Sequence, residues 1–390
     1  MKILHVVQSL DPAQGGPPAV AIRLAAAQSA CGCQVVIASY DNSASAGEID
    51  AAMASVPGIG GITFAKCARD RFAERLFASG AKAGLNEHAA GMDVLHLHGV
   101  WDPILRVAAD TARSKGAMYV VTPHGMLDPW SLTQKPWKKT IALRLGYRRM
   151  LNDAAFLHAL NEDESLLIKP MGLTCPVRIL PNGLFLQELD AVPPRGTFYS
   201  KHPELGGRPY VLFLGRLHHK KGLDHLIEAF HLVAQSCPDA ALVVAGPDGG
   251  ALHKLSSDIL RLGLSDRVHV VGPLFGQDKL AALADAAVFC LPSRQEGFSI
   301  AILEALGCGI PVVISKSCHF PEVSDVGAGE VVELSADQIS RALVRYVREP
   351  VQRRQAGEAA QRLVRSRYTW PSIAKLSINL YEEHLVRPQN

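Results

Sequence analysis

The sequence predicts an α/β protein built from two Rossmann-like domains, each with a parallel sheet covered by helices. Short runs rich in valine, isoleucine and leucine alternate with longer stretches of helical periodicity, which is typical of strands buried on both faces of a sheet. The chain of 390 residues, 48% hydrophobic and 20% charged, is longer than one hydrophobic core usually grows. The apolar runs also fall into two series, so we expect two domains.

Each series supplies the strands of one domain. Between the series, residues 190–208 carry Pro193-Pro194 and Gly206-Gly207 and show no clear periodicity, which predicts a linker. In such sheets ligands bind beyond the carboxyl ends of the strands. The predicted strands are residues 3–7, 34–39, 94–98, 119–123, 156–160 and 177–180 in the first series, and 210–214, 241–245, 268–271, 288–291 and 311–314 in the second.

Composition and spacing exclude several classes of protein. No apolar run reaches the roughly 18 to 20 residues that span a bilayer, and the N-terminus lacks a long apolar leader, so we expect a cytoplasmic protein. The eight scattered cysteines form no CxxC pair and no histidine cluster has zinc-ligand spacing, so reduced thiols are expected. A formal net charge of +3 gives no case for a nucleic-acid partner.

A glycine-rich turn follows the first predicted strand. Gly15-Gly16 precedes two prolines and a predicted helix over residues 19–27. Glycines at a helix N-terminus leave backbone NH groups open to an anion, although the same residues also suit a simple tight turn. No GxGxxG fingerprint is found, which argues against a nicotinamide-dependent oxidoreductase.

Cations gather after the first strand of the second series. Gly215-Arg216 comes directly after that strand, and Lys221-Gly222 precedes a predicted helix. A guanidinium binds phosphate through two parallel hydrogen bonds and an ammonium supplies a point charge, so this loop either binds a diphosphate or is a solvated basic loop. Lys220 is expected to lie at the surface.

Two glutamates eight residues apart follow the predicted strand at 288–291. Glu296 and Glu304 would lie roughly 12 Å apart in a continuous helix, too far for the paired carboxylates of a glycoside hydrolase. They either accept hydrogen bonds from different hydroxyls of one extended ligand or act as a helix cap and a helix-surface residue. The NH groups of residues 297–299 would suit phosphate in the first case.

These motifs together resemble the GT4 family of retaining glycosyltransferases, which have the GT-B fold. His124-Gly125, Pro181-Asn182-Gly183 and Tyr368-Thr369-Trp370 fit the same pattern, so the similarity covers nearly the whole chain. The resemblance implies two Rossmann-like domains facing a central cleft. Residues 1–190 would bind the acceptor, residues 191–368 would bind the donor, and a C-terminal helix over residues 369–390 would return to the first domain.

The resemblance also implies roles for single residues. Glu296 would hold the transferred sugar and Glu304 the ribose, while His124 would lie beside the donor sugar and residues 272–274 would edge the base. Arg216 and Lys221 would carry the diphosphate, and the chain has no Asp-x-Asp motif, so neither a metal nor another cofactor is expected. The implied catalytic set is His124, Glu296, Arg216 and Lys221, and the implied donor-binding set is Gly15, Gly16, Arg216, Lys221, Leu274, Glu296, Gly297, Phe298, Ser299 and Glu304.

The resemblance predicts transfer of a hexose from a UDP- or GDP-sugar, with retention, to a saccharide or lipid-linked saccharide. Synthesis of bacterial surface polysaccharide or glycolipid is the implied context. No residue stands out as a covalent nucleophile, so front-face displacement is expected. The alternative is an epimerase or phosphorylase on the same architecture, and a non-catalytic sensor of nucleotide sugars comes third.

Two further features concern the acceptor side. His98 and Trp101 follow a strand and would either contact a sugar acceptor or belong to a packed loop, and His96 is expected inside the domain. Residues 135–151 carry six cations and no acid, with Leu143, Tyr147, Met150 and Leu151 on one side of a helical wheel. This segment either lies on an anionic membrane at the inner face or docks on its own domain.

Overall fold

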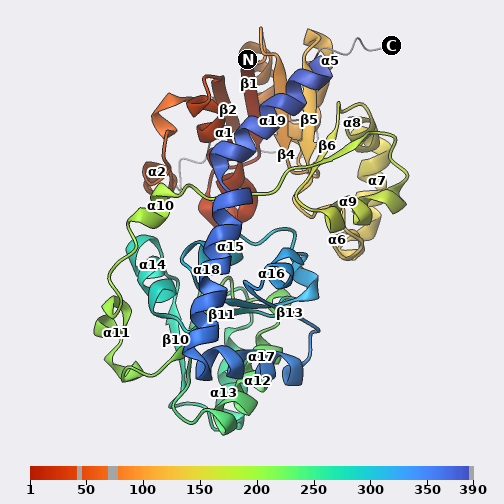
Figure 1. Cartoon of the computed structure of the whole chain (residues 1–390). Helices are drawn as coiled ribbons and strands as arrows, with labels where there is room; N and C mark the ends of the chain where they lie inside the picture. Colours follow the sequence, from red (N-terminus) through yellow and green to blue (C-terminus); the bar gives the residue numbers. More distant parts are fainter. Residues whose placement is uncertain (42–45, 69–77, 386–390) are drawn as a thin grey trace. The chain divides into compact units, whose positions relative to one another are not determined.

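The computed structural model describes residues 1–41, 46–68 and 78–385, which form two compact units (Figure 1). The first unit comprises Met1–Asn182 with Trp370–Asn390, and the second comprises Gly183–Thr369. The predicted boundary between the domains lies at residues 190 and 191. The C-terminal helix α19 (Trp370–Leu385) belongs to the first unit and packs along helix α1 (Gly16–Ala30), as the resemblance implied.

The first unit contains a seven-stranded parallel sheet in the order β3-β2-β1-β4-β5-β6-β7. Its central strands are buried along nearly their whole length, because helices cover both faces. The strands are β1 (Lys2–Val7), β2 (Gln34–Tyr40), β3 (Ile62–Cys67), β4 (Val94–His98), β5 (Met118–Thr122), β6 (Leu157–Ala159) and β7 (Val177–Ile179). The remaining α-helices are α2 (Ala46–Ala54), α4 (Ser79–His88), α5 (Pro103–Lys115), α6 (Pro129–Thr133), α7 (Pro136–Ala142), α8 (Arg148–Asn152) and α9 (Glu162–Ile168).

The second unit repeats this architecture with six parallel strands in the order β10-β9-β8-β11-β12-β13. The strands are β8 (Tyr210–Leu214), β9 (Ala241–Ala245), β10 (Val268–Gly272), β11 (Val288–Leu291), β12 (Val312–Ser315) and β13 (Gly329–Val332). The helices are α10 (Gln187–Asp190), α11 (Thr197–Lys201), α12 (Leu223–Ser236), α13 (Leu252–Arg261), α14 (Gly276–Asp285), α15 (Ile300–Gly307), α16 (Glu322–Asp325), α17 (Ala336–Arg348) and α18 (Pro350–Arg367).

The structure corrects the sequence analysis at the sheet edges and at the expected linker. Strands β3 and β13 were not predicted because an edge strand is partly exposed and lacks a continuous apolar run. Residues 190–208 are not a free linker, since they contain α11 and a short 3-10 helix. Phe198 and Leu205 from this stretch are buried in the core of the second unit.

Each sheet has one point where the order of its strands reverses. In the first sheet the reversal lies between β1 and β4, and in the second it lies between β8 and β11. Loops that leave two such neighbouring strands run in opposite directions and open a crevice at the carboxyl ends, where α/β proteins bind ligands. The predicted site residues concentrate at these two positions.

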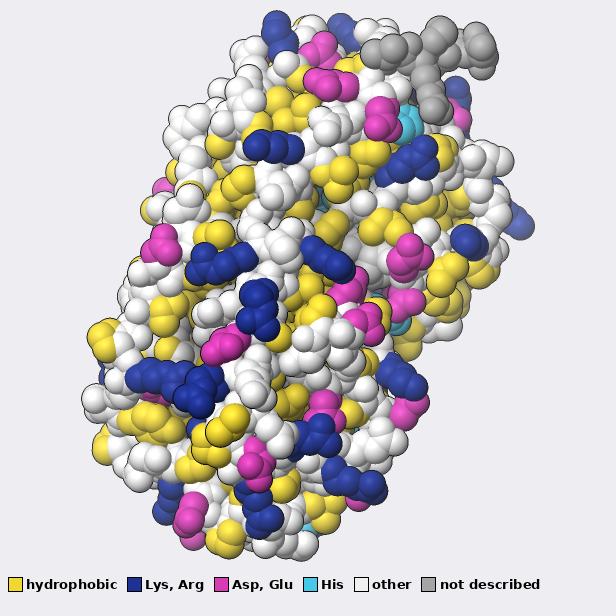
Figure 2. Space-filling model, viewed as in Figure 1, with side chains coloured by type: hydrophobic (Ala, Val, Ile, Leu, Met, Phe, Trp, Pro, Cys, Tyr) yellow, Lys and Arg dark blue, Asp and Glu magenta, His cyan; other side chains and the backbone are white. Residues whose placement is uncertain are grey.

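The surface and the thiols agree with a protein of mixed charge and reduced cysteines. All eight cysteines are free, and most of them are buried. Lysine and arginine side chains are interspersed with carboxylates over the face seen in Figure 2. Within the described residues, no helix is both long and apolar enough to cross a membrane.

Candidate functional site

Two loops of the second unit, after β8 and after β11, bring a predicted lysine and a predicted glutamate together. Lys221 lies in a 3-10 turn before α12, and Glu296 lies in the loop that leads into α15. The Lys221 ammonium is 2.5 Å from Glu296 Oε1, and the hydroxyl of Ser293 donates to the same oxygen at 2.5 Å. The Glu296 side chain is only 9% exposed, so the loops hold a nearly buried carboxylate beside a cation.

A second lysine–carboxylate pair involves a residue that the sequence analysis missed. Lys279 on α14 donates to Glu304 Oε1 on α15 at 2.6 Å. Lys279 is the one cation of α14, whose other residues are acidic, apolar or uncharged. This single positive charge was the feature of the sequence that could have indicated a binding role. Glu296 and Glu304 therefore each have a separate lysine, as suits two carboxylates that hold different parts of one ligand.

A pocket of about 190 Å³ opens beside the second pair. Arg216 and Leu274, both predicted to bind the donor, line it together with Lys279 and Glu304. Gly249 leaves room for the arginine, because a Cβ atom there would lie 2.8 Å from Arg216 Cγ. The other lining residues are Leu214, Gly215, Ala245, Gly246, Pro247, Pro273, Phe275 and Ala301.

The residues between the two glutamates contribute mainly backbone. The Phe298 ring packs against Phe320 and Tyr368, with ring centroids 5.4 and 6.0 Å away, so this side chain belongs to the core. Ser299 is buried and precedes the first residue of α15 in extended conformation. Gly297, Phe298 and Ser299 thus lie at the N-terminus of an eight-residue helix, where backbone NH groups favour an anion.

An ion pair fastens the two loops to each other. The Arg294 guanidinium donates to both carboxylate oxygens of Asp224, at 2.8 and 2.6 Å, and to the carbonyl of His219 at 3.0 Å. Burial alone would raise the pKa of Asp224, but the hydrogen bonds from Arg294 outweigh it and hold the pKa at about 2. This clamp fixes the spacing between the Lys221 loop and the Glu296 loop.

Gly222 is required where the same loops touch, and its replacement gives a first prediction. Gly222 has φ +67°, and a Cβ atom there would lie 1.9 Å from the carbonyl oxygen of Pro292. Gly222→Ala should lower the melting temperature more than Gly250→Ala, a matched control with φ +96° and open space around the Cβ. The control carries only the conformational cost of about 1–2 kcal/mol. Equal losses for the two variants in a thermal melt would contradict the close contact.

In the first unit, the glycine turn has the predicted form. Gly15 is the N-cap of α1 with φ 99°, the helix begins at Gly16, and prolines occupy its first turn. A Cβ atom at Gly16 would meet nothing within 4 Å, so steric room alone does not require a glycine there. Both interpretations of this turn, an anion-binding site and a simple tight turn, therefore remain predictions.

His124 lies in a strained turn after β5. It is one of the described non-glycine residues with positive φ, 53°, a conformation that persists only where surrounding contacts enforce it. The next residue is held by a carboxylate: Gly125 donates its backbone NH to Glu164 Oε1 at 2.6 Å, and Leu160 donates to Oε2 at 2.6 Å. Glu164 is a buried residue of α9 that the sequence analysis did not identify.

Five histidines of the first unit form a network at its strand reversal. His5 on β1 pairs in register with His96 on β4, and His98 follows on the same face. The spacing of these histidines along the sequence does not reveal the cluster, because its members come from separate strands. Ligating atoms of these three residues lie within 4.8 Å of one another, close enough for a metal ion. The histidine network consists of His5, His96, His98, His124 and His158.

Hydrogen bonds already use both ring nitrogens of the three clustered histidines. His5 contacts His98 and Gln28, at 2.9 and 2.7 Å, and a metal ion would have to replace such bonds. Burial is the main cause that lowers the pKa throughout the network, to about 4 for His5 and well below the usual value for His96 and His98. The cluster is therefore neutral at pH 7.

The acceptor predictions have different outcomes. His98 is 2% exposed, and both its ring nitrogens bond inside the domain, which corresponds to the packed alternative. His96 is buried, as expected. Trp101 is partly buried, donates to the carbonyl of Met126 at 3.3 Å and lies under Lys139, with 5.4 Å from Nζ to the ring centroid. Its contact with an acceptor stays a prediction.

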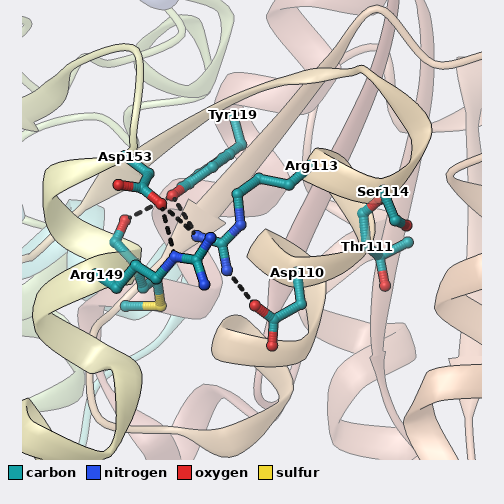
Figure 3. A network of polar contacts seen from close by, with 8 residues as sticks. Asp110, Thr111, Arg113, Ser114, Tyr119, Arg149 and Asp153 are labelled. Carbon is teal, nitrogen blue, oxygen red and sulfur yellow. Dashed lines mark hydrogen bonds and ion pairs between the residues drawn. The ribbon is translucent and has the colours of Figure 1, made fainter.

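The basic segment 135–151 docks on its own domain through the apolar side of its helical wheel, which was one of the two alternatives. Met150 and Leu151 are fully buried, because the continuous helix assumed in the wheel breaks at Gly146, with φ 104°, and α8 packs on α5. Figure 3 shows the polar contacts at this junction, where Asp153 accepts from Arg149 at 3.1 Å and from Arg113 at 2.9 Å. The buried face is thus a domain contact.

Family comparisons identify the class of protein. Residues 15–183 match the family described as Glycosyl transferase 4-like domain, and residues 195–363 match Glycosyl transferases group 1. The chain belongs to the GT4-type glycosyltransferases. The epimerase or phosphorylase alternative accordingly gives way to a glycosyltransferase.

Known relatives and solved structures agree with this family. The glycosyltransferase is 27% identical, over 71% of this chain and 74% of the relative, to a GDP-mannose-dependent monoacylated alpha-(1-6)-phosphatidylinositol monomannoside mannosyltransferase of Corynebacterium glutamicum. It is 28% identical, over 76% of each chain, to a GDP-mannose:cellobiosyl-diphosphopolyprenol alpha-mannosyltransferase of Xanthomonas oryzae. HepE of Anabaena, solved with UDP and glucose, superposes with a TM-score of 0.78 at 19% identity, over 98% of this chain and 100% of HepE. This last likeness shows the GT-B fold.

Proposed function

We propose that this glycosyltransferase moves mannose from GDP-mannose, with retention and without a metal, to a lipid-linked saccharide at an anionic membrane surface. The observation that carries the proposal is the convergence of two lysine–glutamate pairs and Arg216 at the carboxyl ends of β8 and β11. The choice of GDP-mannose and of a lipid-linked acceptor is supported by the named activities of the relatives from Corynebacterium and Xanthomonas.

In this proposal the two pairs hold opposite parts of the donor. Glu304, which lines the pocket together with Leu274, accepts from the ribose hydroxyls. The Lys221 and Ser293 hydrogen bonds both reach Oε1 of Glu296, so the other carboxylate oxygen is placed to accept from a hydroxyl of the sugar. His124 and the turn at Gly15 and Gly16, to which the resemblance also gives roles toward the donor, belong to the first unit, and those roles stay predictions.

The reaction needs positive charge where the diphosphate leaves. Breaking the sugar–phosphate bond produces an oxocarbenium-like sugar and a nucleoside diphosphate, and cations already in place stabilise that developing charge. An ammonium has three donors, so Lys221 can keep Glu296 while it donates to a phosphate oxygen, and Arg216 offers a planar fork. In a front-face displacement the departing phosphate takes the acceptor proton, and no residue forms a covalent adduct.

A binding and transfer experiment tests the proposal. The melting temperature should rise most with GDP and GDP-mannose and less with UDP-glucose, because a ligand of the folded state stabilises it with the logarithm of saturation. Release of GDP should require the lipid-linked acceptor and persist in EDTA. Release of mannose phosphate or an epimer without acceptor, or a mannosyl-enzyme adduct in mass spectrometry, would contradict it.

The membrane part of the proposal rests on exposed side chains of the basic segment. Trp137, Ile141 and Leu145 are 63%, 48% and 64% exposed, and they recur at four-residue intervals over α7 and the following turn. Lys138 and Arg144 are exposed beside them. Large apolar side chains flanked by cations suit the interface of an anionic bilayer, where each cation near the surface adds about 1 kcal/mol.

Vesicle flotation gives the second prediction. The protein should float with vesicles of phosphatidylglycerol and phosphatidylcholine but not with phosphatidylcholine alone, and added salt should reduce binding. Trp137→Ser with Ile141→Ser should reduce binding severalfold, whereas Leu260→Ser, at a residue 71% exposed in the second unit, should not. Undiminished flotation of the double variant would place the membrane contact elsewhere.

A further inference from the structure

Backbone carbonyls determine which atom is the donor in each hydrogen bond of the histidine network. A carbonyl oxygen only accepts hydrogen bonds, so each bond to a carbonyl identifies its donor. The Ser377 hydroxyl on α19 donates to the carbonyl of Ala374 at 2.7 Å, and its oxygen must therefore accept from Gln28 Nε2 at 2.8 Å. This orients the Gln28 amide, whose Oε1 then accepts from His5 Nε2 at 2.7 Å.

The same donor and acceptor order continues from His5 on β1 to His124, in the turn after β5. A neutral imidazole has one donor and one acceptor nitrogen, so His5 Nδ1 accepts from His98 Nε2 at 2.9 Å. His98 Nδ1 then accepts from His124 Nε2 at 3.2 Å. His124 is left with its lone pair on Nδ1, and among the described residues no hydrogen-bond partner of Nδ1 is seen.

A second chain of hydrogen bonds, through His158 and His96, fixes the orientation of the Gln28 amide independently. His158 Nε2 donates to the carbonyl of Leu180 at 2.7 Å, so its Nδ1 accepts from the Thr122 hydroxyl at 2.9 Å. Thr122 Oγ1 accepts from His96 Nε2 at 2.6 Å, and His96 Nδ1 accepts from the Tyr381 hydroxyl at 2.6 Å.

The two branches meet at one side chain. The oxygen of Tyr381 then accepts from Gln28 Nε2 at 3.3 Å, so both branches require the same orientation of the Gln28 amide. Gln28 is fully buried, and helix α19 lies along α1, which carries it. The carbonyls of Ala374 and Leu180 thus determine which atom is the donor in each hydrogen bond between them.

We infer that Gln28, His5 and His98 form a one-way hydrogen-bond relay that fixes His124 as the Nε2–H tautomer, leaving Nδ1 to accept a hydrogen bond from a substrate hydroxyl. The tautomer follows from the contacts alone, and its use toward substrate rests on the proposed function. Gln28, His5 and His98 are positioning residues that act through His124. Helix α19 supplies Ser377 and Tyr381, which anchor the relay. This helix therefore determines which ring nitrogen carries the proton in His124, in the turn after β5.

Nitrogen-15 spectra of histidine-labelled full-length protein at pH 7.5 test the relay without any substrate. His124, assigned by the signals lost in His124→Asn, should show one neutral form with a protonated Nε2 and an unprotonated Nδ1. Free imidazole in water populates both tautomers. A His124 with protonated Nδ1 would overturn the relay, whatever the activity proves to be.

A variant separates the relay from ordinary packing. Gln28→Met removes the acceptor of His5, so a second tautomer of His124 should appear and kcat with GDP-mannose should fall about tenfold, the effect of one buried hydrogen bond. Tyr119→Phe is the control, because that buried hydroxyl donates to the Met150 carbonyl outside the network. If Gln28→Met fails to fold, Ser377→Ala combined with Tyr381→Phe removes both acceptors of the Gln28 amide and should also produce the second tautomer. A single unchanged His124 tautomer in a folded variant of either kind would refute the relay.

Discussion

Replacing Lys221 by methionine is expected to lower the rate constant kcat of transfer by about a hundredfold to a thousandfold. The ammonium lies 2.5 Å from Glu296 at the carboxyl end of β8, and methionine keeps most of the apolar stem while removing the charge. Developing charge on the departing diphosphate would then lose one donor already in place. Steady-state kinetics with GDP-mannose measure the change.

The neighbouring lysine supplies the control for this variant. Lys220, which was expected at the surface, is partly buried and lies outside the pair with Glu296. Lys220→Met removes the same charge one residue away but leaves that pair intact, so it should change kcat less than about threefold. The melting temperatures of the two variants should be compared, because loss of Lys221 also leaves the carboxylate of Glu296 without its cation. Similar kcat values for both variants would show that Lys221 does not stabilise the leaving group.

Acid is expected to destabilise the first unit strongly, between pH 6.5 and 4. Burial lowers the pKa of His5 and of His158 to about 4. As pH falls below 6.5 the unfolded chain binds protons at these histidines while the folded chain does not, so the free energy of unfolding falls until about pH 4. From pH 7.5 to 5.0 these two residues together should cost about 4 kcal/mol. This is the least expected loss, because burial lowers the pKa of His96, His98 and His124 as well.

Melting curves at these two pH values measure the loss. A change of about 4 kcal/mol corresponds to a drop of about 10 °C for a unit of this size. Carboxylates such as Asp224, with a pKa of about 2, lose their contribution only below about pH 4, so the interval isolates the histidines. An unchanged melting temperature at pH 5.0 would mean that the buried histidines are not neutral in the folded state.

The donor-side residues could be predicted from sequence because their motifs resemble those of the GT4 family and because the fold class places them after strands. A continuous apolar run predicts a central strand, and residues that follow two neighbouring parallel strands must meet at one edge of the sheet. Lys221 and Glu296 follow β8 and β11, so their pairing needed only the order of the strands. Lys279 was missed because its partner depends on how α14 packs beside α15, which periodicity does not specify.

The histidine network and the basic segment show where sequence patterns fail. His5 and His96 meet through strand register, so spacing along the chain cannot reveal them. The helical wheel over residues 135–151 assumed one straight helix, whereas Gly146 breaks it and rotates the apolar residues that follow onto the domain. Both cases depend on tertiary geometry, which the residue types along the chain do not specify.

The crystal structure of the complex with GDP-mannose tests the central claim most directly. We expect the diphosphate to contact Arg216 and Lys221, the ribose to donate to Glu304, and a mannose hydroxyl to donate to Glu296. A nucleotide bound away from the carboxyl ends of β8 and β11, with these four side chains untouched, would contradict the account.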